Sequence, residues 1–204
     1  MFKNGKLFGI IAVLILTLPA ICSAESWDLN LSAGGDSIIG GIHYKSYLET
    51  GYFRIGGSGV FVSEDDSDFS LGQADFTVGS DTMMPGLNVD VGLSAVMGTA
   101  SDDDDDTSGD VGAVGFLVSM NYLFPPEMIP IPLEIFGGAT WAPGPLSFAD
   151  TENYREIQAG VGVRIIKNAS IIFTYRNYHI EMEKDKEDWD FDHGTYQIGI
   201  VMRF

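Results

Sequence analysis

The last ten residues, 195–204, have the pattern that most restricts how this chain can fold. Alternate positions form an apolar set and a set of mostly small, polar or charged residues: Tyr196, Ile198, Ile200, Met202 and Phe204 against Thr195, Gln197, Gly199, Val201 and Arg203. A two-residue period is that of a β-strand with two different faces, whereas an amphipathic helix repeats every 3.6 residues. The sequence therefore ends in a predicted strand with one fully apolar face.

The same alternation recurs upstream. It is clearest in residues 87–98, where Leu87, Val89 and Val91 alternate with Asn88 and Asp90. The other predicted strands are 27–33, 37–45, 52–62, 71–79, 111–122, 131–141, 154–166 and 170–180. The 25 glycines and the abundance of aromatic and β-branched residues also favour many short strands. With the closing segment, ten strands are predicted.

The connections between these strands alternate in character. Every second one is long, acidic or both, namely 63–68, 100–110, 142–153 and 181–194, and those between them are mostly shorter. Outer-membrane barrels place long loops outside the cell and short turns in the periplasm. The pattern therefore predicts an all-β fold, a closed antiparallel up-and-down transmembrane β-barrel. Closure is required because unpaired backbone groups in hydrocarbon cost several kcal/mol each.

A soluble two-sheet sandwich also alternates, and its apolar faces would form a core. The two folds differ in what surrounds the apolar faces. In the barrel they contact lipid, and aromatic residues near the strand ends form girdles at the membrane interfaces. The predicted girdle residues are Trp27, Tyr44, Tyr52, Tyr122, Trp141 and Tyr196.

Residues 1–24 are predicted to be a signal peptide, and residues 25–204 the barrel. Lys3 and Lys6 precede the apolar run 7–18, and a small-residue site ends at Ala24, before Glu25. A retained membrane anchor is the alternative, but the run is shorter than the ~20 residues that a spanning helix needs. The predicted location is the bacterial outer membrane. Cleavage removes Cys22, the single cysteine, so no disulfide is expected.

The net charge of −18 excludes nucleic acid as a partner, because phosphate binding depends on Lys and Arg. Removal of Lys3 and Lys6 with the signal peptide makes the charge still more negative. The expected partners are outer-membrane lipid and the barrel-assembly machinery, and the protein is expected to be a monomer. The aromatic ending resembles the C-terminal strand of outer-membrane barrels, whose final Phe the assembly machinery reads. This resemblance implies that Tyr196 and Phe204 form the assembly signal.

The faces opposite the apolar ones would line the lumen. They carry four arginines and four carboxylates: Arg54, Asp75, Asp90, Glu134, Glu156, Arg164, Arg176 and Arg203. A barrel of this size is narrow enough for side chains to fill, so one interpretation is a structural network of paired charges. The other is a narrow polar channel, for which the small residues Gly160, Gly162 and Gly199 would leave room. The predicted function is thus structural or narrow-pore, with a charged lumen and acidic external loops.

The acidic run 102–106 contains half of a calcium-loop signature. Asp104, Asp106 and Asp110 are the candidate ligands for a divalent cation, but Gly115 stands where the closing glutamate is needed. A solvated external loop is the alternative, and the acidic segment 181–192 has the same interpretation. No other cofactor is indicated.

An outer-membrane enzyme, either a surface hydrolase or a lipid-modifying enzyme, is the alternative function. Such a site at the external rim would use His with carboxylates or Ser. His179 and His193 flank the last predicted external loop near Asp190 and Asp192, and His43 lies on the second strand. The sequence contains no nucleophile elbow, zinc-binding spacing or phosphate-binding glycine loop, so no catalytic residue is assigned.

Three stretches carry a family resemblance. They are Ala139 to Asp150 (ATWAPGPLSFAD), Tyr154 to Arg164 (YREIQAGVGVR) and Phe173 to Tyr178 (FTYRNY). Over roughly the last 70 residues, which contain these stretches, the chain resembles the YfaZ family of bacterial outer-membrane proteins, and elsewhere it does so only by pattern. The resemblance implies a signal peptide and an outer-membrane barrel, and it implies no established activity. The acidic insertion 102–106 departs from the family pattern.

Overall fold

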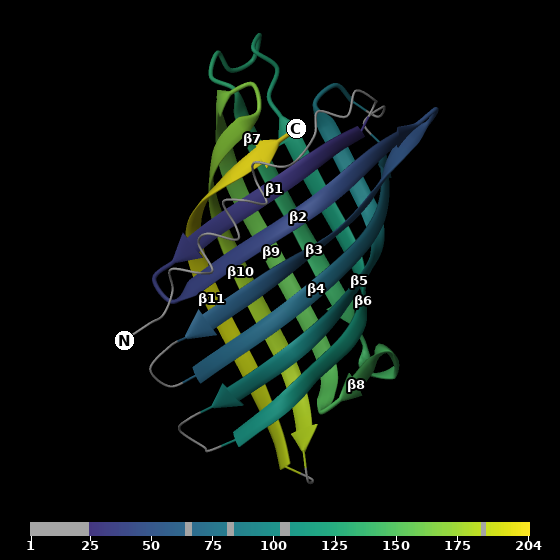
Figure 1. The fold of residues 1–204 in the computed structure, drawn as a ribbon, viewed down its shortest axis with the longest axis vertical. Coiled ribbons are helices and arrows are strands. Elements are labelled where there is room, and N and C mark those ends of the chain that lie inside the picture. The colour runs from purple at the N-terminus through teal and green to yellow at the C-terminus, as the bar shows by residue number, and fades with distance from the viewer. Residues whose placement is uncertain (1–24, 64–66, 81–83, 103–106, 185–186) are drawn as a thin grey trace.

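A computed structural model of the chain describes residues 25–63, 67–80, 84–102, 107–184 and 187–204 (Figure 1). The strands are β1 (Glu25–Gly34), β2 (Ser37–Leu48), β3 (Gly51–Ser63), β4 (Ser67–Ser80), β5 (Leu87–Asp102), β6 (Thr107–Leu123), β7 (Leu133–Ala142), β8 (Ser147–Ala149), β9 (Thr151–Ile166), β10 (Ala169–Lys184) and β11 (Glu187–Arg203). A short 3-10 turn, η1 (Gly144–Leu146), precedes β8. Among the described residues, no helix is long and apolar enough to cross a membrane.

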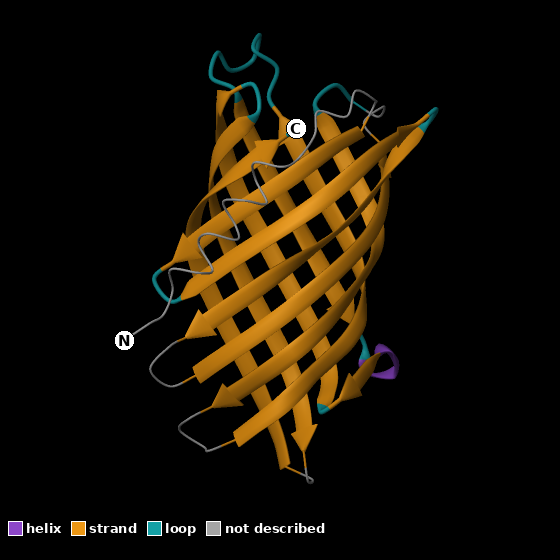
Figure 2. Ribbon diagram, in the orientation of Figure 1, coloured by secondary structure: helices purple, strands orange, loops and turns teal. Residues whose placement is uncertain are grey.

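Ten of these strands close into an antiparallel barrel, as predicted. The sheet order is β5-β4-β3-β2-β1-β11-β10-β9-β7-β6, and β5 pairs with β6 to complete the ring. The first and last strands meet from Asp28 opposite Arg203 to Gly34 opposite Gln197. Beyond this ladder the backbones of Trp27 and Phe204 exchange N–H···O bonds of 3.0 and 2.9 Å. The eleventh strand, β8, is not part of the ring and pairs only with residues 111–113, near the start of β6. Figure 2 shows the tilt of the strands around the ring.

The two ends of the barrel differ. β1 begins and β11 ends at one rim, which we call the terminal rim. β2, β4, β6 and β9 also end there, and the described connections 49–50, 124–132 and 167–168 lie at this rim. The opposite rim, the loop rim, is where β1, β3, β5, β7 and β10 end, and it holds the described connections 35–36 and 143–150. Both chain ends of the barrel therefore lie on the same side of the membrane.

The outward faces are apolar and exposed around the middle of the barrel. On β5, Leu93 is 46% exposed, and on β11, Ile198 is 65% exposed. Neighbouring strands add Phe76, Phe116 and Phe173 to the same outer surface. In a sandwich these side chains would be buried in a core, so the sandwich interpretation is wrong. The exterior presents the apolar band that a barrel turns to lipid.

The strands continue further toward the loop rim than predicted. β10 and β11 run through most of the predicted loop 181–194, and β5 and β6 take up the ends of 100–110. In these extensions the alternation persists but the faces exchange polarity. Met182 and Phe191 point inward and are buried, while Glu181 and Asp192 lie on the outer face. The prediction of long loops was wrong here because it treated acidic residues as loop residues without testing their period.

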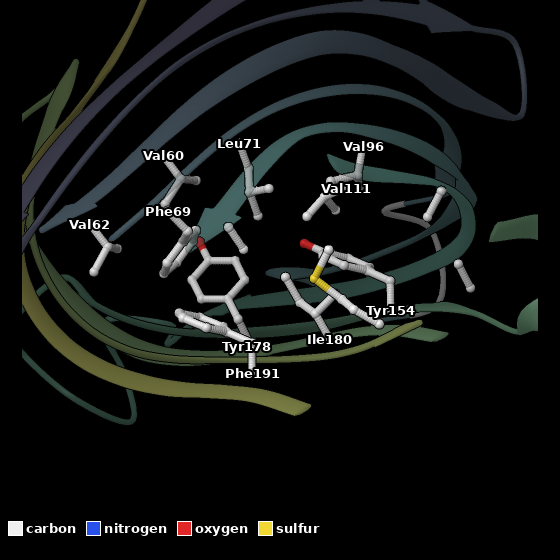
Figure 3. Close-up of a cluster of buried hydrophobic side chains, with 14 of the residues drawn as sticks. Val60, Val62, Phe69, Leu71, Val96, Val111, Tyr154, Tyr178, Ile180 and Phe191 are labelled. Atoms are coloured by element: carbon white, nitrogen blue, oxygen red, sulfur yellow. The ribbon is translucent and has the colours of Figure 1, made fainter. Parts of the chain in front are cut away.

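The inward apolar residues form a cluster that fills the lumen near the loop rim (Figure 3). We call it the outer core. It consists of Ile39, Val60, Val62, Phe69, Leu71, Val96, Ala100, Val111, Ala113, Ala142, Tyr154, Tyr178, Ile180, Met182 and Phe191. Phe69 contacts the rings of Tyr178 and Phe191 edge-on at centroid distances of 5.1 and 5.0 Å. Residues from opposite walls of the barrel thus meet across its interior.

The predicted aromatic girdle is partly wrong. Tyr196 and Trp141 lie exposed on the exterior, and the ring of Trp27 packs against that of Tyr44 at 5.0 Å. Tyr52 is only 2% exposed and lines the lumen instead. It shares the inward face of β3 with Arg54, two positions along, so the strand's own period excludes it from the exterior.

We expect a charge on the apolar band to destabilise the barrel in a depth-dependent way. Leu93→Arg places a guanidinium in the middle of the apolar run of β5 and should lower the free energy of unfolding by about 2–4 kcal/mol. Thr99→Arg, outward on the same strand but nearer the loop rim, should cost only about 0–1 kcal/mol. Denaturant titrations in lipid vesicles measure both values. Equal costs would contradict the placement of the band.

Candidate functional site

All eight charged residues predicted for the lumen point inward, and seven of them form ion pairs between arginine and carboxylate groups. Arg176 Nη1 lies 2.8 Å from Glu156 Oε1, and Arg54 Nη1 lies 3.8 Å from Asp90 Oδ2. Asp75 pairs with a histidine rather than an arginine, with His43 Nε2 at 3.5 Å from its Oδ2. Seven of the eight come from the terminal-rim halves of their strands, and Glu156 lies nearer the loop rim on β9.

Glu134 pairs with two arginines. Arg203 Nη2 donates to both of its carboxylate oxygens, at 3.2 and 3.1 Å, and Arg164 Nη2 lies 3.9 Å away. Arg203 also donates to Ser170 Oγ at 2.9 Å. Glu134 is buried, and a buried carboxylate is tolerated when it is paired and hydrogen-bonded. This group ties β7, β9, β10 and β11 together near the terminal rim.

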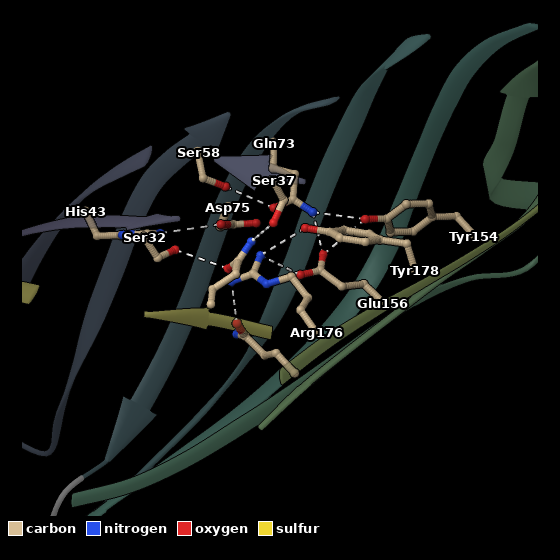
Figure 4. Close-up of polar contacts among 12 residues, drawn as sticks. Ser32, Ser37, His43, Ser58, Gln73, Asp75, Tyr154, Glu156, Arg176 and Tyr178 are labelled. Atoms are coloured by element: carbon tan, nitrogen blue, oxygen red, sulfur yellow. Dashed lines mark hydrogen bonds and ion pairs between the residues drawn. The ribbon is translucent and has the colours of Figure 1, made fainter. Parts of the chain in front are cut away.

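A layer of hydrogen bonds crosses the lumen between the terminal-rim half and the outer core (Figure 4). Gln73 Nε2 donates to Tyr154 Oη at 3.0 Å, and Tyr154 Oη donates to Glu156 Oε2 at 3.0 Å. Arg176 then donates to Glu156, to Gln158 Oε1 at 2.6 Å and to Tyr178 Oη at 3.4 Å. The layer joins β4 on one wall to β9 and β10 on the other.

A cavity of about 250 Å³ lies on the terminal-rim side of this layer. We call it the polar chamber. Its charged lining residues are Asp28, His43, Lys45, Arg54, Asp90, Glu134, Arg176 and Arg203. Asn30, Thr174 and Gln197 are among its neutral polar residues. The lumen is thus divided into a polar chamber at one end and an apolar core at the other.

A second series of hydrogen bonds follows the seam between β1 and β11 toward the loop rim. Gln197 Nε2 donates to Ser37 Oγ at 2.8 Å, and Ser37 Oγ lies 2.9 Å from Thr195 Oγ1. Thr195 Oγ1 donates to Asp36 Oδ1 at 3.0 Å, and His193 Nε2 lies 3.0 Å from Asp36 Oδ2. Backbone pairing of β1 with β11 ends at Gly34, so these side chains hold the β1–β2 hairpin against β11 beyond that point.

The glycines expected to leave room for a channel instead make room for neighbouring side chains. A Cβ at Gly160 would overlap the ring of Phe136, one at Gly162 would crowd Glu134, and one at Gly199 would crowd Ser32. These residues come from the adjoining strands. The small residues therefore allow the interior to be filled.

The histidines proposed for an enzyme site are separated. His193 points into the barrel, where its ring centroid lies 5.5 Å from that of Phe69. His179 lies on the exterior, 3.4 Å from Asp192 and 3.3 Å from Glu181. Asp190 is also exposed, and His43 is in the polar chamber. The wall of the barrel stands between His179 and His193, so they do not form one site.

The candidate metal ligands Asp104 and Asp106 lie outside the described residues. Asp110 is described, and its backbone N–H donates to Asp150 Oδ2 at 2.9 Å. Within the described ranges, no group of three or more His, Cys, Asp and Glu residues has the geometry to hold a metal ion. Divalent cation binding remains a prediction for the acidic connection.

The predicted assembly signal lies on the outside of the closing strand. Tyr196 is exposed and packs beside Phe173 and Tyr175, with ring centroids at 6.0 and 4.9 Å. Phe204 is exposed at the terminal rim, with its backbone bonded to Trp27. The outward face of this strand is thus continuous with the apolar band.

A closed antiparallel barrel with an exposed apolar band around its exterior defines an integral outer-membrane protein. The family model described as YfaZ precursor matches residues 10–204. The chain therefore belongs to the YfaZ family and is located in the bacterial outer membrane. The word precursor agrees with the signal peptide predicted at residues 1–24, which lie outside the described residues. Comparison with curated proteins gave no match.

Several solved structures are similar in outline. OmpT of Vibrio cholerae is 9% identical, with 82% of this chain and 56% of that chain covered and a TM-score of 0.40. Neisserial surface protein A is 11% identical, with 88% and 94% covered and a TM-score of 0.35. The translocator domain of the autotransporter NalP from Neisseria meningitidis is 11% identical, with 98% and 96% covered and a TM-score of 0.39.

We expect the pair formed by Glu156 and Arg176 to be sensitive to removal of one partner. Glu156→Leu leaves a buried guanidinium without its carboxylate and should lower the free energy of unfolding by about 3–5 kcal/mol. Adding Arg176→Met should recover much of that loss. Arg164→Met removes a 3.9 Å contact of a partly exposed arginine and should cost about 0–1 kcal/mol. A double variant no more stable than Glu156→Leu would contradict the pairing.

Proposed function

We propose that the protein is a non-conducting barrel with a structural role in the outer membrane. The observation that carries this proposal is the outer core. Val60, Val96, Tyr154, Tyr178 and Ile180 are each 0% exposed inside the end of the barrel near the loop rim. A water-filled pore needs a continuous polar path, and close-packed side chains exclude water. The outer core supports a sealed lumen over the narrow pore.

The charged residues of the lumen fit the same role. Each of the eight predicted charged residues contacts a partner side chain on another strand, and such pairs hold the strands in register inside a narrow barrel. Gly160, Gly162 and Gly199 support the seal as well, since their space is occupied by other side chains. We assign the terminal rim to the periplasm and the loop rim to the outside, following the usual placement of barrel termini and turns.

The partners in this proposal are outer-membrane lipid and the barrel-assembly machinery. The exposed apolar band supports the first. The exposed Tyr196 and Phe204 on the closing strand support the second, because an extended segment presented by its end and one face is available for recognition. We propose that the barrel works as a monomer, since its ring of strands is complete within one chain.

Planar-bilayer recording tests the seal. The wild-type protein should give no discrete conductance steps. The combined variant Phe69→Ala, Tyr178→Ala and Phe191→Ala removes three rings that meet inside the outer core, and it should give steps. The matched control, Phe61→Ala, Phe76→Ala and Phe173→Ala, removes three rings from the exterior and should stay silent.

Folding of each variant is checked by heat-modifiable migration on a gel, since core truncations cost about 3–5 kcal/mol per large aromatic residue. If the triple variant does not fold, Phe69→Ala alone, at the centre of the ring cluster, replaces it. Regular steps from the wild-type protein would contradict the proposal and restore the narrow pore.

A further inference from the structure

The polar chamber contains an arrangement of positive charge that the structural role does not require. Lys45 and Arg54 stand directly opposite each other on β2 and β3, and both line the chamber. Like charges directly opposite on neighbouring strands destabilise a sheet. Such a pair becomes favourable when an anion lies between the two cations.

Neither Lys45 nor Arg54 has all of its hydrogen-bond donors satisfied by protein groups. Lys45 Nζ lies 3.4 Å from the ring centroid of Tyr52 and 4.8 Å from that of Tyr47. Within the described residues it forms no ion pair and no hydrogen bond. The rings hold the ammonium in place through cation–π contacts and leave its N–H donors available.

The ion pair that Arg54 forms is a long one. The contact with Asp90 is 3.8 Å long, and Asp90 Oδ2 also accepts a bond of 3.1 Å from Ser119. The Nε atom of Arg54 is buried with no hydrogen-bond partner, and so is the Nε atom of Arg176 on the opposite wall. Buried donors without partners are uncommon in proteins and can take an acceptor, although Asp90 Oδ1 beside Arg54 is a buried acceptor that also has no partner.

The chamber is also where this acidic protein concentrates its positive charge. The chain has 29 Asp and Glu against 11 Lys and Arg. The chamber lining has Lys45, Arg54, Arg176 and Arg203 against Asp28, Asp90 and Glu134. Arg176 is paired with Glu156 and Arg203 with Glu134, so Lys45 and Arg54 are the cations available to a ligand.

We propose that the chamber binds a small oxyanion, a carboxylate or phosphate, between Lys45 and Arg54. A guanidinium presents paired donors that match two oxygens of such a group, and an ammonium adds a point charge. The volume of about 250 Å³ admits a small solute. The inference adds a ligand to the proposed function but does not depend on the seal, because binding in detergent and conductance in a bilayer are separate measurements.

The test is calorimetric titration of the detergent-solubilised full barrel with inorganic phosphate and, separately, acetate. Saturable binding of either anion by the wild-type protein supports the proposal. Lys45→Gln should weaken it about tenfold. The matched control is Lys167→Gln, an exposed lysine in the turn 167–168 at the same rim, which should change binding less than twofold.

The substitution Asp90→Asn should change anion affinity in the opposite direction. It removes the carboxylate that competes for Arg54 and keeps the side-chain volume, so it should tighten binding several-fold. A purely structural Arg54 would not show this gain. The proposal fails if neither the wild-type protein nor Asp90→Asn binds either anion saturably. It also fails if Lys45→Gln and Lys167→Gln weaken binding equally.

Discussion

The structure depends on the need to satisfy every backbone N–H and C=O group in a medium that offers no hydrogen bonds. For strands, the only solution in hydrocarbon is a closed ring. Here the ring closes where β1 meets β11, through seven residue pairs and the two backbone bonds between Trp27 and Phe204. Side-chain bonds from Asp36 and Ser37 to His193 and Thr195 extend the seam beyond the last backbone pair.

Closure gives each strand an inward and an outward face. The polarity of these two faces changes along the length of the strand. Near the terminal rim and through the apolar band, polar side chains face in and apolar ones face lipid. Toward the loop rim the outward face becomes polar and the inward face apolar. β10 shows the exchange clearly, with Tyr175 outside and Arg176 inside, followed by His179 outside and Ile180 inside. We interpret the exchange as the level at which the exterior leaves lipid for water and the interior packs as a soluble core does.

The interior balances charge burial against packing. Removing charges from water is costly unless each has a partner, and the chamber supplies partners for most of them. The hydrogen-bonded layer built by Gln73, Tyr154, Glu156 and Arg176 lies between the charged and the apolar halves. Tyr154 and Tyr178 belong to both the layer and the outer core, because their rings lie in the outer core and their hydroxyl groups in the layer. The division of the lumen therefore has a physical boundary made by a few residues.

Local alternation was sufficient to predict the ten strands of the barrel and which residues of a strand share a face, because a strand's period is two residues. It was not sufficient to predict which charges pair, since Gln73 and Glu156 meet across the barrel and are distant in sequence. It also missed the outer core. The signal was present, for example in Val60 and Val62 flanking Phe61, but it was hidden by the assumption that one face is apolar throughout. Tyr52 and the separated histidines were misplaced for the same reason: residue type was weighed above period.

The exchange of faces along β10 is tested most directly by single-cysteine scanning from Ile171 to Met182, in protein lacking Cys22 and reconstituted in lipid vesicles. Each position carries a fluorophore, and quenching by lipid-confined and by aqueous nitroxides is compared. Positions 171, 173 and 175 should be quenched from lipid, 179 and 181 from water, and 178, 180 and 182 from neither. Lipid quenching at the even positions, or aqueous quenching at 178 and 180, would contradict the account.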